Sequence, residues 1–309
     1  MKTLNDLRQL QRVRRPLVLA AGFFDGVHRG HARVVQRAVA RARRLNGNAW
    51  VLTFDTHPLK VLAPARAPRL LTCTPHKLRL LAALGVHGCL VLRFTRRLAR
   101  QEPERFVERL CAAAPTLAAI LVGGNWRFGR AGRGDAALLK RIGRARGFAV
   151  EVVRPVRRRQ RPVSSTRVRQ AVQRGQLGEA AAMLGRPFSI MATVTRGRRV
   201  GRTLGFPTAN LLPHNEVMPP PGVYAVRARV GTRMHDGVLN FGYRPTFADA
   251  PGRPILELHL LNFRGNLYGR LLEVFFVRRL RAERRFNTLR GLQQRIAADT
   301  QAARRALRR

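Results

Sequence analysis

One stretch near the N-terminus constrains the fold more than any other, because an apolar run, a glycine-rich bend and a helical pattern follow one another directly. The run is Leu17–Ala21, and the bend at residues 22–31 reads Gly-Phe-Phe-Asp-Gly-Val-His-Arg-Gly-His. Apolar residues then recur at helical spacing, at Val34, Val35, Ala38, Val39 and Ala42. The pattern predicts a buried strand that enters a helix through a sharp turn, since glycine permits turns and close approaches that other residues resist.

Two histidines, His28 and His31, stand three residues apart where that helix begins, so both side chains can face one ligand. The free N–H groups and the positive dipole end of a helix favour an anion there. We therefore expect a phosphate-binding site. Two alternatives are half of a zinc site and ordinary polar residues of a turn. The zinc alternative lacks partners, because the three cysteines of the chain are scattered and form no close pair.

The spacing His-x-Gly-His resembles the phosphate-binding signature of the nucleotidyltransferase superfamily. In that superfamily, a phosphate of one substrate attacks the α-phosphorus of a nucleotide and pyrophosphate leaves. The surrounding pattern agrees, because strands predicted at 17–21, 48–54, 88–94, 117–122 and 149–153 alternate with helical segments. The alternation predicts a Rossmann-like, doubly wound parallel α/β sheet. Asp55 follows the second strand and either faces the ligand pocket or caps a turn.

Residues 161–169, Arg-Pro-Val-Ser-Ser-Thr-Arg-Val-Arg, predict a second anion-binding element at a helix start. A short helix at 177–184 then ends at Gly185, and Pro187 stops its continuation. We place the domain boundary there, which gives domains at 1–186 and 187–309. In the second domain, short strands separated by glycine, proline and asparagine predict an antiparallel β-barrel. A helix from Thr288 onward closes the chain, and its apolar face should pack on the barrel through Leu289, Leu292, Ile296 and Ala303.

Residues 201–210, Gly-Arg-Thr-Leu-Gly-Phe-Pro-Thr-Ala-Asn, are the strongest signal in the barrel. Thr208 and Asn210 flank Ala209, so their oxygens face the same side of an extended chain. Neutral oxygens beside nucleotide phosphates suit Mg²⁺, which shares its coordination with phosphates and water. The glycines Gly201 and Gly205 would let this loop close over a polyanion.

Glu257 sits in the middle of a predicted strand, between leucines, in a chain with few acids. Strand alternation turns it away from those leucines, toward solvent or a pocket. As a general base it could deprotonate a substrate hydroxyl that attacks a γ-phosphate. The alternative is an ordinary solvated strand residue. No Gly-Lys-Ser/Thr phosphate loop occurs in the chain, so a kinase here would be of another type.

The formal net charge of +44, from 60 basic and 16 acidic residues, points to polyanions. The arginines, however, are spread along the whole chain, without a basic tail or an aromatic platform for stacking bases. We therefore expect adventitious RNA binding and no specific nucleic acid partner. A basic nucleic-acid-binding protein on an enzyme-derived scaffold is the alternative function. Few cysteines, no signal peptide and no apolar stretch of membrane-spanning length predict a cytoplasmic protein without a membrane partner. The oligomeric state stays open.

Taken together, the motifs resemble the bacterial bifunctional riboflavin kinase/FAD synthetase family over nearly the whole chain. The matching stretches are 24–31, 122–129, 164–169, 205–211, 222–225, 244–247 and 267–269. The resemblance implies an N-terminal FMN adenylyltransferase and a C-terminal flavokinase barrel. ATP would be the co-substrate of both, with Mg²⁺, and riboflavin, FMN and FAD would be substrates and products.

The resemblance also implies residue roles. His28 and His31 would bind the ATP phosphates and stabilise charge on the α-phosphorus, and Glu257 would be the base for the ribityl 5′-hydroxyl. The remaining nucleotide-binding positions would be Phe24, Gly26, Asn125, Ser164, Thr166, Arg169, Gly201 and Gly205, and the metal-binding positions Thr208 and Asn210. The chain departs from the family pattern at Thr56, Ala192, Arg196, Asn262 and Asn266. Two of these border the expected kinase loop, so they bear on the kinase more than on adenylylation.

Overall fold

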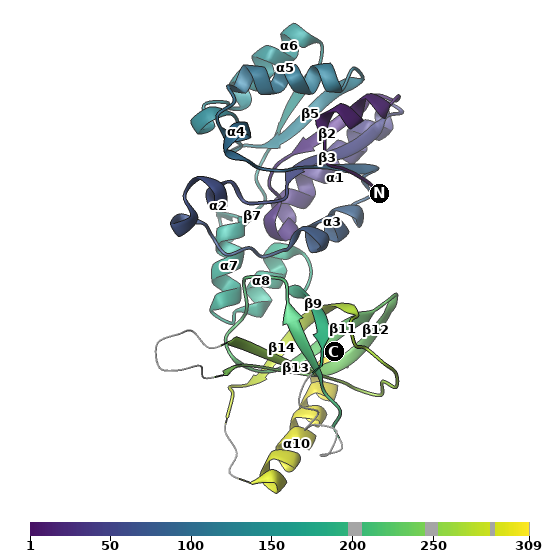
Figure 1. Ribbon diagram of the computed structural model, residues 1–309, viewed down its shortest axis with the longest axis vertical. Helices are drawn as coiled ribbons and strands as arrows, with labels where there is room; N and C mark the ends of the chain where they lie inside the picture. Colours follow the sequence, from purple (N-terminus) through teal and green to yellow (C-terminus); the bar gives the residue numbers. More distant parts are fainter. Residues whose placement is uncertain (197–205, 245–252, 285–287, 309) are drawn as a thin grey trace. The chain divides into compact units, whose positions relative to one another are not determined.

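The computed structural model describes residues 1–196, 206–244, 253–284 and 288–308, which form two compact units (Figure 1). The first unit comprises Met1–Arg69 and Thr74–Ser165, and the second comprises Leu70–Cys73 and Thr166–Arg309. The short segment 70–73 belongs to the second unit because its backbone bonds there. The Leu70 carbonyl accepts from the Val217 N–H at 3.1 Å, and the Leu71 carbonyl accepts from the Asn215 side chain.

A six-stranded sheet organises the first unit, in the order β1-β4-β3-β2-β5-β6, with all neighbours parallel. The strands are β1 (Lys2–Leu4), β2 (Leu17–Ala21), β3 (Asn48–Phe54), β4 (Gly88–Leu92), β5 (Leu117–Gly123) and β6 (Ala149–Val153). The predicted parallel α/β sheet is confirmed. The edge strand β1 was not predicted, because its 3 residues are too few to show a period.

Helices cover both faces of this sheet, as a doubly wound fold requires. The helices are α1 (Arg29–Arg44), α2 (Pro58–Leu62), α3 (Thr74–Ala82), α4 (Arg96–Ala99), α5 (Pro103–Ala113) and α6 (Ala136–Arg146). Alternation along β2 sends Val18 into one core cluster with α1 and α3, and Leu19 into the other with α5 and α6. A two-stranded hairpin, β7 (Arg157–Arg158) with β8 (Arg161–Pro162), follows the sheet.

The strand order reverses beside β2, since β3 and β4 continue the sheet on one side and β5 and β6 on the other. Ligands of open α/β sheets bind outside the carboxyl ends of the strands at such a switch point. The loop after β2 is the glycine–histidine bend, and the loop after β5 leads to Asn125. The topology therefore brings both predicted elements to one edge of the sheet.

The second unit is built around a closed antiparallel barrel in the order β10-β13-β12-β11-β14-β9. Two helices, α7 (Ser165–Gln173) and α8 (Leu177–Leu184), precede it. The strands are β9 (Ser189–Thr195), β10 (Ala209–Pro213), β11 (Gly222–Val230), β12 (Arg233–Arg244), β13 (Arg253–Leu260) and β14 (Leu271–Arg281). The predicted barrel is confirmed. The boundary at residues 186 and 187 stays a prediction, and the contacts of the chain group α8 with the barrel.

The closing helix α10 (Leu289–Leu307) begins after Thr288, whose hydroxyl accepts the Gly291 N–H at 3.1 Å. Ala303 and Leu307 are buried against Val223 and Val238 on the outer face of β11 and β12. The predicted packing is thus confirmed at Ala303. Leu292, in contrast, is only half-buried and, with Ile296, lines a pocket between α10 and the barrel.

Candidate functional site

The bend after β2 is held in an unusual backbone conformation. Phe24 (φ 57°), Gly26 (φ 77°) and Val27 (φ 40°) all adopt positive φ. Only glycine tolerates this region freely, and a β-branched residue such as Val27 is rarely found there. Strain of this kind persists where the surrounding structure enforces it, and it concentrates at functional sites. The surrounding structure therefore fixes the backbone of residues 22–31 in a defined conformation, and we call this segment the glycine–histidine turn.

His28 caps α1, and its Nδ1 accepts the backbone N–H of His31 at 3.3 Å. An Nδ1 that accepts a hydrogen bond carries no proton, so the neutral ring of His28 holds its proton on Nε2. The two rings stack with centroids 3.6 Å apart and planes inclined by 17°. Gly30 makes room for this pair, because a Cβ there would lie 3.1 Å from the His28 ring.

Burial holds the pKa of His31 well below its ordinary value of 6.5, and electrostatic interaction with His28 and Lys77 lowers it further. His31 is therefore neutral at pH 7. Its Nδ1 is buried and has no hydrogen-bond partner among the described residues, and the Phe24 ring meets the imidazole edge-on at 5.2 Å. A buried polar atom without a partner is costly, so the site has unused capacity for a polar ligand.

The other predicted residues of this site are divided between the two units. The Ser165 hydroxyl donates to the Asp25 carbonyl at 2.9 Å, which fastens the segment with Ser164 to the turn. Asn125 is exposed just beyond the carboxyl end of β5, next to β2. Thr166 and Arg169 lie on α7, among the residues of the second unit.

Of the two alternatives for Asp55, its hydrogen bonds support a structural role. Its Oδ1 accepts the backbone N–H of Phe94 at 3.1 Å, and its carbonyl accepts the Thr74 hydroxyl at 3.1 Å. One bond connects the end of β3 to Phe94, which follows β4, and the other connects it to Thr74, which begins α3. Asp55 therefore holds the rim of the sheet together.

An apolar pocket of about 210 Å³ also lies in the first unit. Its walls include the aromatic residues Phe54, Phe94, Phe106, Trp126 and Phe128. The Trp126 and Phe128 rings stack at 4.5 Å with planes inclined by 20°. Flat aromatic walls of this kind favour a flat, largely apolar ring system, because aromatic contacts prefer stacked or edge-on geometry.

In the second unit, strand register assembles the predicted barrel site. Ala209 pairs with Leu258, which is buried in the barrel, whereas Asn210 pairs with Glu257. Paired residues of antiparallel strands share a face, so Asn210 and Glu257 both lie on the outer face. Asn240 also pairs with Glu257, and a polar row therefore crosses β10, β13 and β12. The prediction that Glu257 turns away from its leucines is confirmed.

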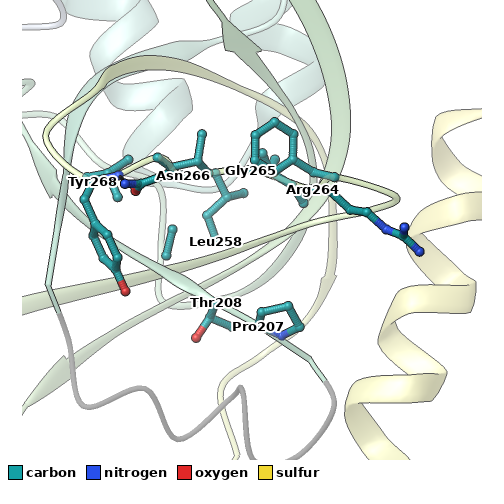
Figure 2. Close-up of a pocket in the computed structure, with 12 residues that line it drawn as sticks. Pro207, Thr208, Leu258, Arg264, Gly265, Asn266 and Tyr268 are labelled. Atoms are coloured by element: carbon teal, nitrogen blue, oxygen red, sulfur yellow. Dashed lines mark hydrogen bonds between the residues drawn. The ribbon is translucent and has the colours of Figure 1, made fainter.

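Thr208 lies between two pockets of the second unit. The larger, about 520 Å³, is drawn in Figure 2, where loop residues Arg264, Gly265 and Asn266 lie opposite Thr208 and Pro207. The smaller, about 200 Å³, is lined by Thr208, Asn240, Glu257 and residues of α10. Thr208 lines both spaces, so the two pockets adjoin at this residue.

The oxygens of Thr208 and Asn210 are a donor set that fits Mg²⁺, because they are hard, neutral and on one face of the chain. Among the described residues, no group of three His, Cys, Asp or Glu side chains could hold a metal ion alone. A cation here would need phosphate oxygens to complete its coordination. Gly201 and Gly205, the predicted nucleotide-binding glycines of the adjoining loop, lie outside the described residues.

Three features were missed from the sequence. Lys77 is buried beneath the glycine–histidine turn, and Asn240 joins the polar row of the barrel. Asp299 is buried on α10, where the Arg281 guanidinium donates to it from Nε at 3.0 Å and from a terminal nitrogen at 2.8 Å. The spacing of Lys77 four residues before the buried Leu81 was a usable signal, since such residues share a helix face.

Comparison with known proteins agrees with this architecture. The family model described as FAD synthetase matches residues 10–167, and the one described as riboflavin kinase matches residues 184–307. A bifunctional riboflavin kinase/FMN adenylyltransferase of Escherichia coli (strain K12) is 38% identical over 98% of this chain and 97% of its own. A protein of the same description from Bacillus subtilis (strain 168) is 33% identical over 93% of this chain and 91% of its own.

A crystal structure of a Streptococcus pneumoniae protein, described as a macrolide-efflux protein, superposes with a TM-score of 0.84. It is 27% identical in sequence, and the match covers 98% of this chain and 99% of the other. Within the described residues of this chain, no helix has both the length and the apolar character that crossing a bilayer would take. The likeness supports the two-unit architecture along its whole length.

A Rossmann-like parallel sheet followed by a closed antiparallel barrel, matched by the FAD synthetase and riboflavin kinase family models, defines a two-domain nucleotide-dependent transferase. The chain belongs to the family of bifunctional riboflavin kinase/FMN adenylyltransferases. It phosphorylates riboflavin to FMN and adenylylates FMN to FAD, with ATP as the co-substrate of both steps.

Proposed function

We propose that the glycine–histidine turn of the first unit is the site of adenylyl transfer. The observation that carries this is the stacked pair His28 and His31 at the switch point of the sheet, with a buried imidazole nitrogen that lacks a partner. The His28 Nε2–H and the amide groups at the start of α1 would donate to the triphosphate of ATP. These donors stabilise the negative charge that develops on the α-phosphoryl oxygens as the FMN phosphate attacks.

Phe24 would act in this site through its backbone, because its side chain is buried against His31. Gly26 would let the backbone pass close to the phosphates. Asn125 and Ser164 would contact the nucleotide from the loops beside the turn, and Thr166 and Arg169 would bind pyrophosphate oxygens. The Ser165–Asp25 bond supports this assignment, since it fixes the serine segment on the turn.

The aromatic pocket of the first unit would hold the isoalloxazine ring of FMN. A tricyclic, flat ring fits walls formed by Phe54, Trp126 and Phe128, and stacking on these aromatic rings would position it. The phosphate of FMN would then extend out of the apolar pocket toward the turn. Positioning of both reactants supplies much of the rate, because it turns a bimolecular encounter into a step within one complex.

In the barrel, Glu257 would be the general base that takes the proton of the ribityl 5′-hydroxyl as its oxygen attacks the γ-phosphorus of ATP. Its place on the wall of the smaller pocket, in register with Asn240 and Asn210, supports this role. The smaller pocket would take riboflavin and the larger one ATP, with Thr208 at their junction. Mg²⁺, held by Thr208, Asn210 and the ATP phosphates, would neutralise the charge of the triphosphate.

Two substitutions test this division of labour in the full chain. Glu257→Gln should lower riboflavin phosphorylation by about 10²–10⁴-fold, as expected for loss of a general base, and leave adenylylation of supplied FMN intact. His28→Ala should lower adenylylation of supplied FMN and leave riboflavin phosphorylation intact. Both rates are measured by chromatography of the flavins formed. If either variant lost both activities while remaining folded, the assignment of one site to each unit would be wrong.

We also propose a cytoplasmic location. Cys89 and Cys111 are free thiols in the structure, which suits a reducing compartment.

A further inference from the structure

Lys77 is a buried cation directly beneath the glycine–histidine turn. It extends from α3, its exposed fraction is 2%, and its ammonium lies 4.4 Å from the centroid of the Phe23 ring. The Nζ donates to the Phe54 carbonyl at 2.6 Å, the Phe23 carbonyl at 3.3 Å and the Thr53 hydroxyl at 3.4 Å. Thr53 in turn donates to the same Phe23 carbonyl at 2.9 Å. The ammonium therefore links Phe54, at the end of β3, to Phe23 in the glycine–histidine turn.

These bonds determine how the next peptide group is oriented. A trans peptide directs its carbonyl and its N–H in opposite directions, and the described residues contain no cis bond. Anchoring the Phe23 carbonyl on Lys77 and Thr53 therefore points the Phe24 N–H away from them. This N–H donates no hydrogen bond to another residue that the structure describes. It is an oriented donor on the side of the turn opposite Lys77.

Lys77 also acts on the histidine pair through its charge. It contributes to the lowered pKa of His31, which means that the ammonium lies within electrostatic reach of that imidazole. Burial lowers the pKa of Lys77 itself to about 8, and the carboxylates of Asp25 and Asp55 and the Cys89 thiol oppose this shift. A methionine of similar length would avoid the cost of a buried charge. That cost is offset once an anion binds nearby, and the triphosphate of ATP is such an anion.

We propose that Lys77 is a positioning residue for adenylyl transfer, which fixes the Phe23 carbonyl, aims the Phe24 N–H at the nucleotide and places positive charge behind His31. The inference rests on the proposed function of the turn. Lys77 makes no contact with the reacting atoms in this scheme. It acts through the backbone and through the imidazole, and it adds the element α3 to a site otherwise built from β2, α1 and the segment before α7.

The test compares Lys77→Met with Lys77→Arg and with Lys140→Met, all in the full chain. Lys140 is exposed on α6, so its substitution removes the same charge without touching the turn. Lys77→Met should lower kcat/KM of FMN adenylylation for ATP by about ten- to a hundredfold, the range for one lost charge-assisted hydrogen bond. Lys77→Arg, which keeps charge and donors, should recover part of this, and Lys140→Met should lose nothing. Riboflavin phosphorylation by the same molecules should be unchanged in all three variants.

Folding is monitored separately, because Trp50 and Trp126 both lie in the first unit and report on it alone. Thr53→Val provides a second route should Lys77→Met unfold that unit, since it removes the hydroxyl that shares the Phe23 carbonyl, and it should lower adenylylation in the same direction. The proposal would be overturned if Lys77→Met or Thr53→Val is folded and adenylylates FMN at the parental rate while His31→Gln is inactive. Parental adenylylation in His31→Gln as well would instead overturn the assignment of the turn.

Discussion

At the scale of single residues, the proposed adenylylation site contains a buried imidazole that is neutral in the free protein. His31 is kept uncharged by burial and by electrostatic interaction with its neighbours His28 and Lys77. A polyanion placed against this ring reverses the balance, because opposite charge favours the protonated form. The site therefore gains a positive charge when the nucleotide arrives, instead of holding it in the empty state.

This predicts that ATP binding takes up protons. The pKa of His31 lies well below 6.5 in the free protein and should rise in the complex, so proton uptake should be measurable at pH values where the free imidazole is neutral and the bound one is protonated. Calorimetric titration with ATP, without flavin, in two buffers of different ionisation enthalpy measures the uptake. His31→Gln should reduce it while leaving any contribution of the barrel site. Equal uptake by the parent and the variant would contradict the prediction.

At the scale of elements, α10 is attached to the barrel by apolar contacts near its end and by a buried ion pair near its middle. Ala303 and Leu307 supply the former, and Asp299 with Arg281 of β14 supplies the latter. The Asp299 side chain is 6% exposed, and Arg295 also approaches it at 3.3 Å. Because Arg281 and Asp299 both line the smaller pocket, this pair holds the wall of the proposed riboflavin site.

Asp299→Asn should therefore destabilise the barrel by about 3–5 kcal/mol, the cost of breaking a buried ion pair from one side. Asp236→Asn is the matched control, because its pair with Arg227 is nearly half-exposed on both sides and should contribute at most about 1 kcal/mol. All three tyrosines lie in the second unit and both tryptophans in the first. The urea midpoint from tyrosine absorbance should fall in Asp299→Asn while that from tryptophan fluorescence stays constant. Equal midpoints for the two variants would refute the special role of the pair.

The sequence predicted those parts of the site that depend on local pattern. The strand–turn–helix around His28 and His31 and the outward face of Glu257 follow from periods of 3.6 and 2 along the chain. The residues that pair with Glu257 do not follow from these periods. Its alignment with Asn240 and Asn210 depends on the register of strands that are distant in sequence. Lys77 was missed because a lysine on a helix is normally solvent-exposed. The positive φ of Val27 could not be predicted, because nothing local favours it.

At the scale of the whole molecule, the charge is out of proportion to the ion pairs that could balance it. The chain carries 60 basic residues and only 16 acidic ones. Acidic groups such as Glu102 and Glu151 each lie near two arginines. The basic residues of the sequence nevertheless far outnumber the carboxylates that could balance their charge. Mutual repulsion among the basic residues opposes compactness, although it favours solubility.

The melting temperature should therefore rise with ionic strength. Between about 0.01 M and 0.15 M NaCl the screening length falls from about 30 Å to about 8 Å, which removes most repulsion between exposed arginines. We expect a rise of several degrees in scanning calorimetry, with sucrose as an uncharged control. A melting temperature that did not change with salt would show that the repulsion is already compensated in another way.

The place of Thr208, on the partition between two cavities, has a consequence for how such a barrel can diversify. A bulkier side chain at this position would narrow both chambers in a single step, and a smaller one would merge them. With the proposed assignment of the larger cavity to ATP and the smaller one to riboflavin, tolerance for a new phosphoryl donor and tolerance for a new acceptor would change together. A lineage that alters one preference through this residue must alter the other as well.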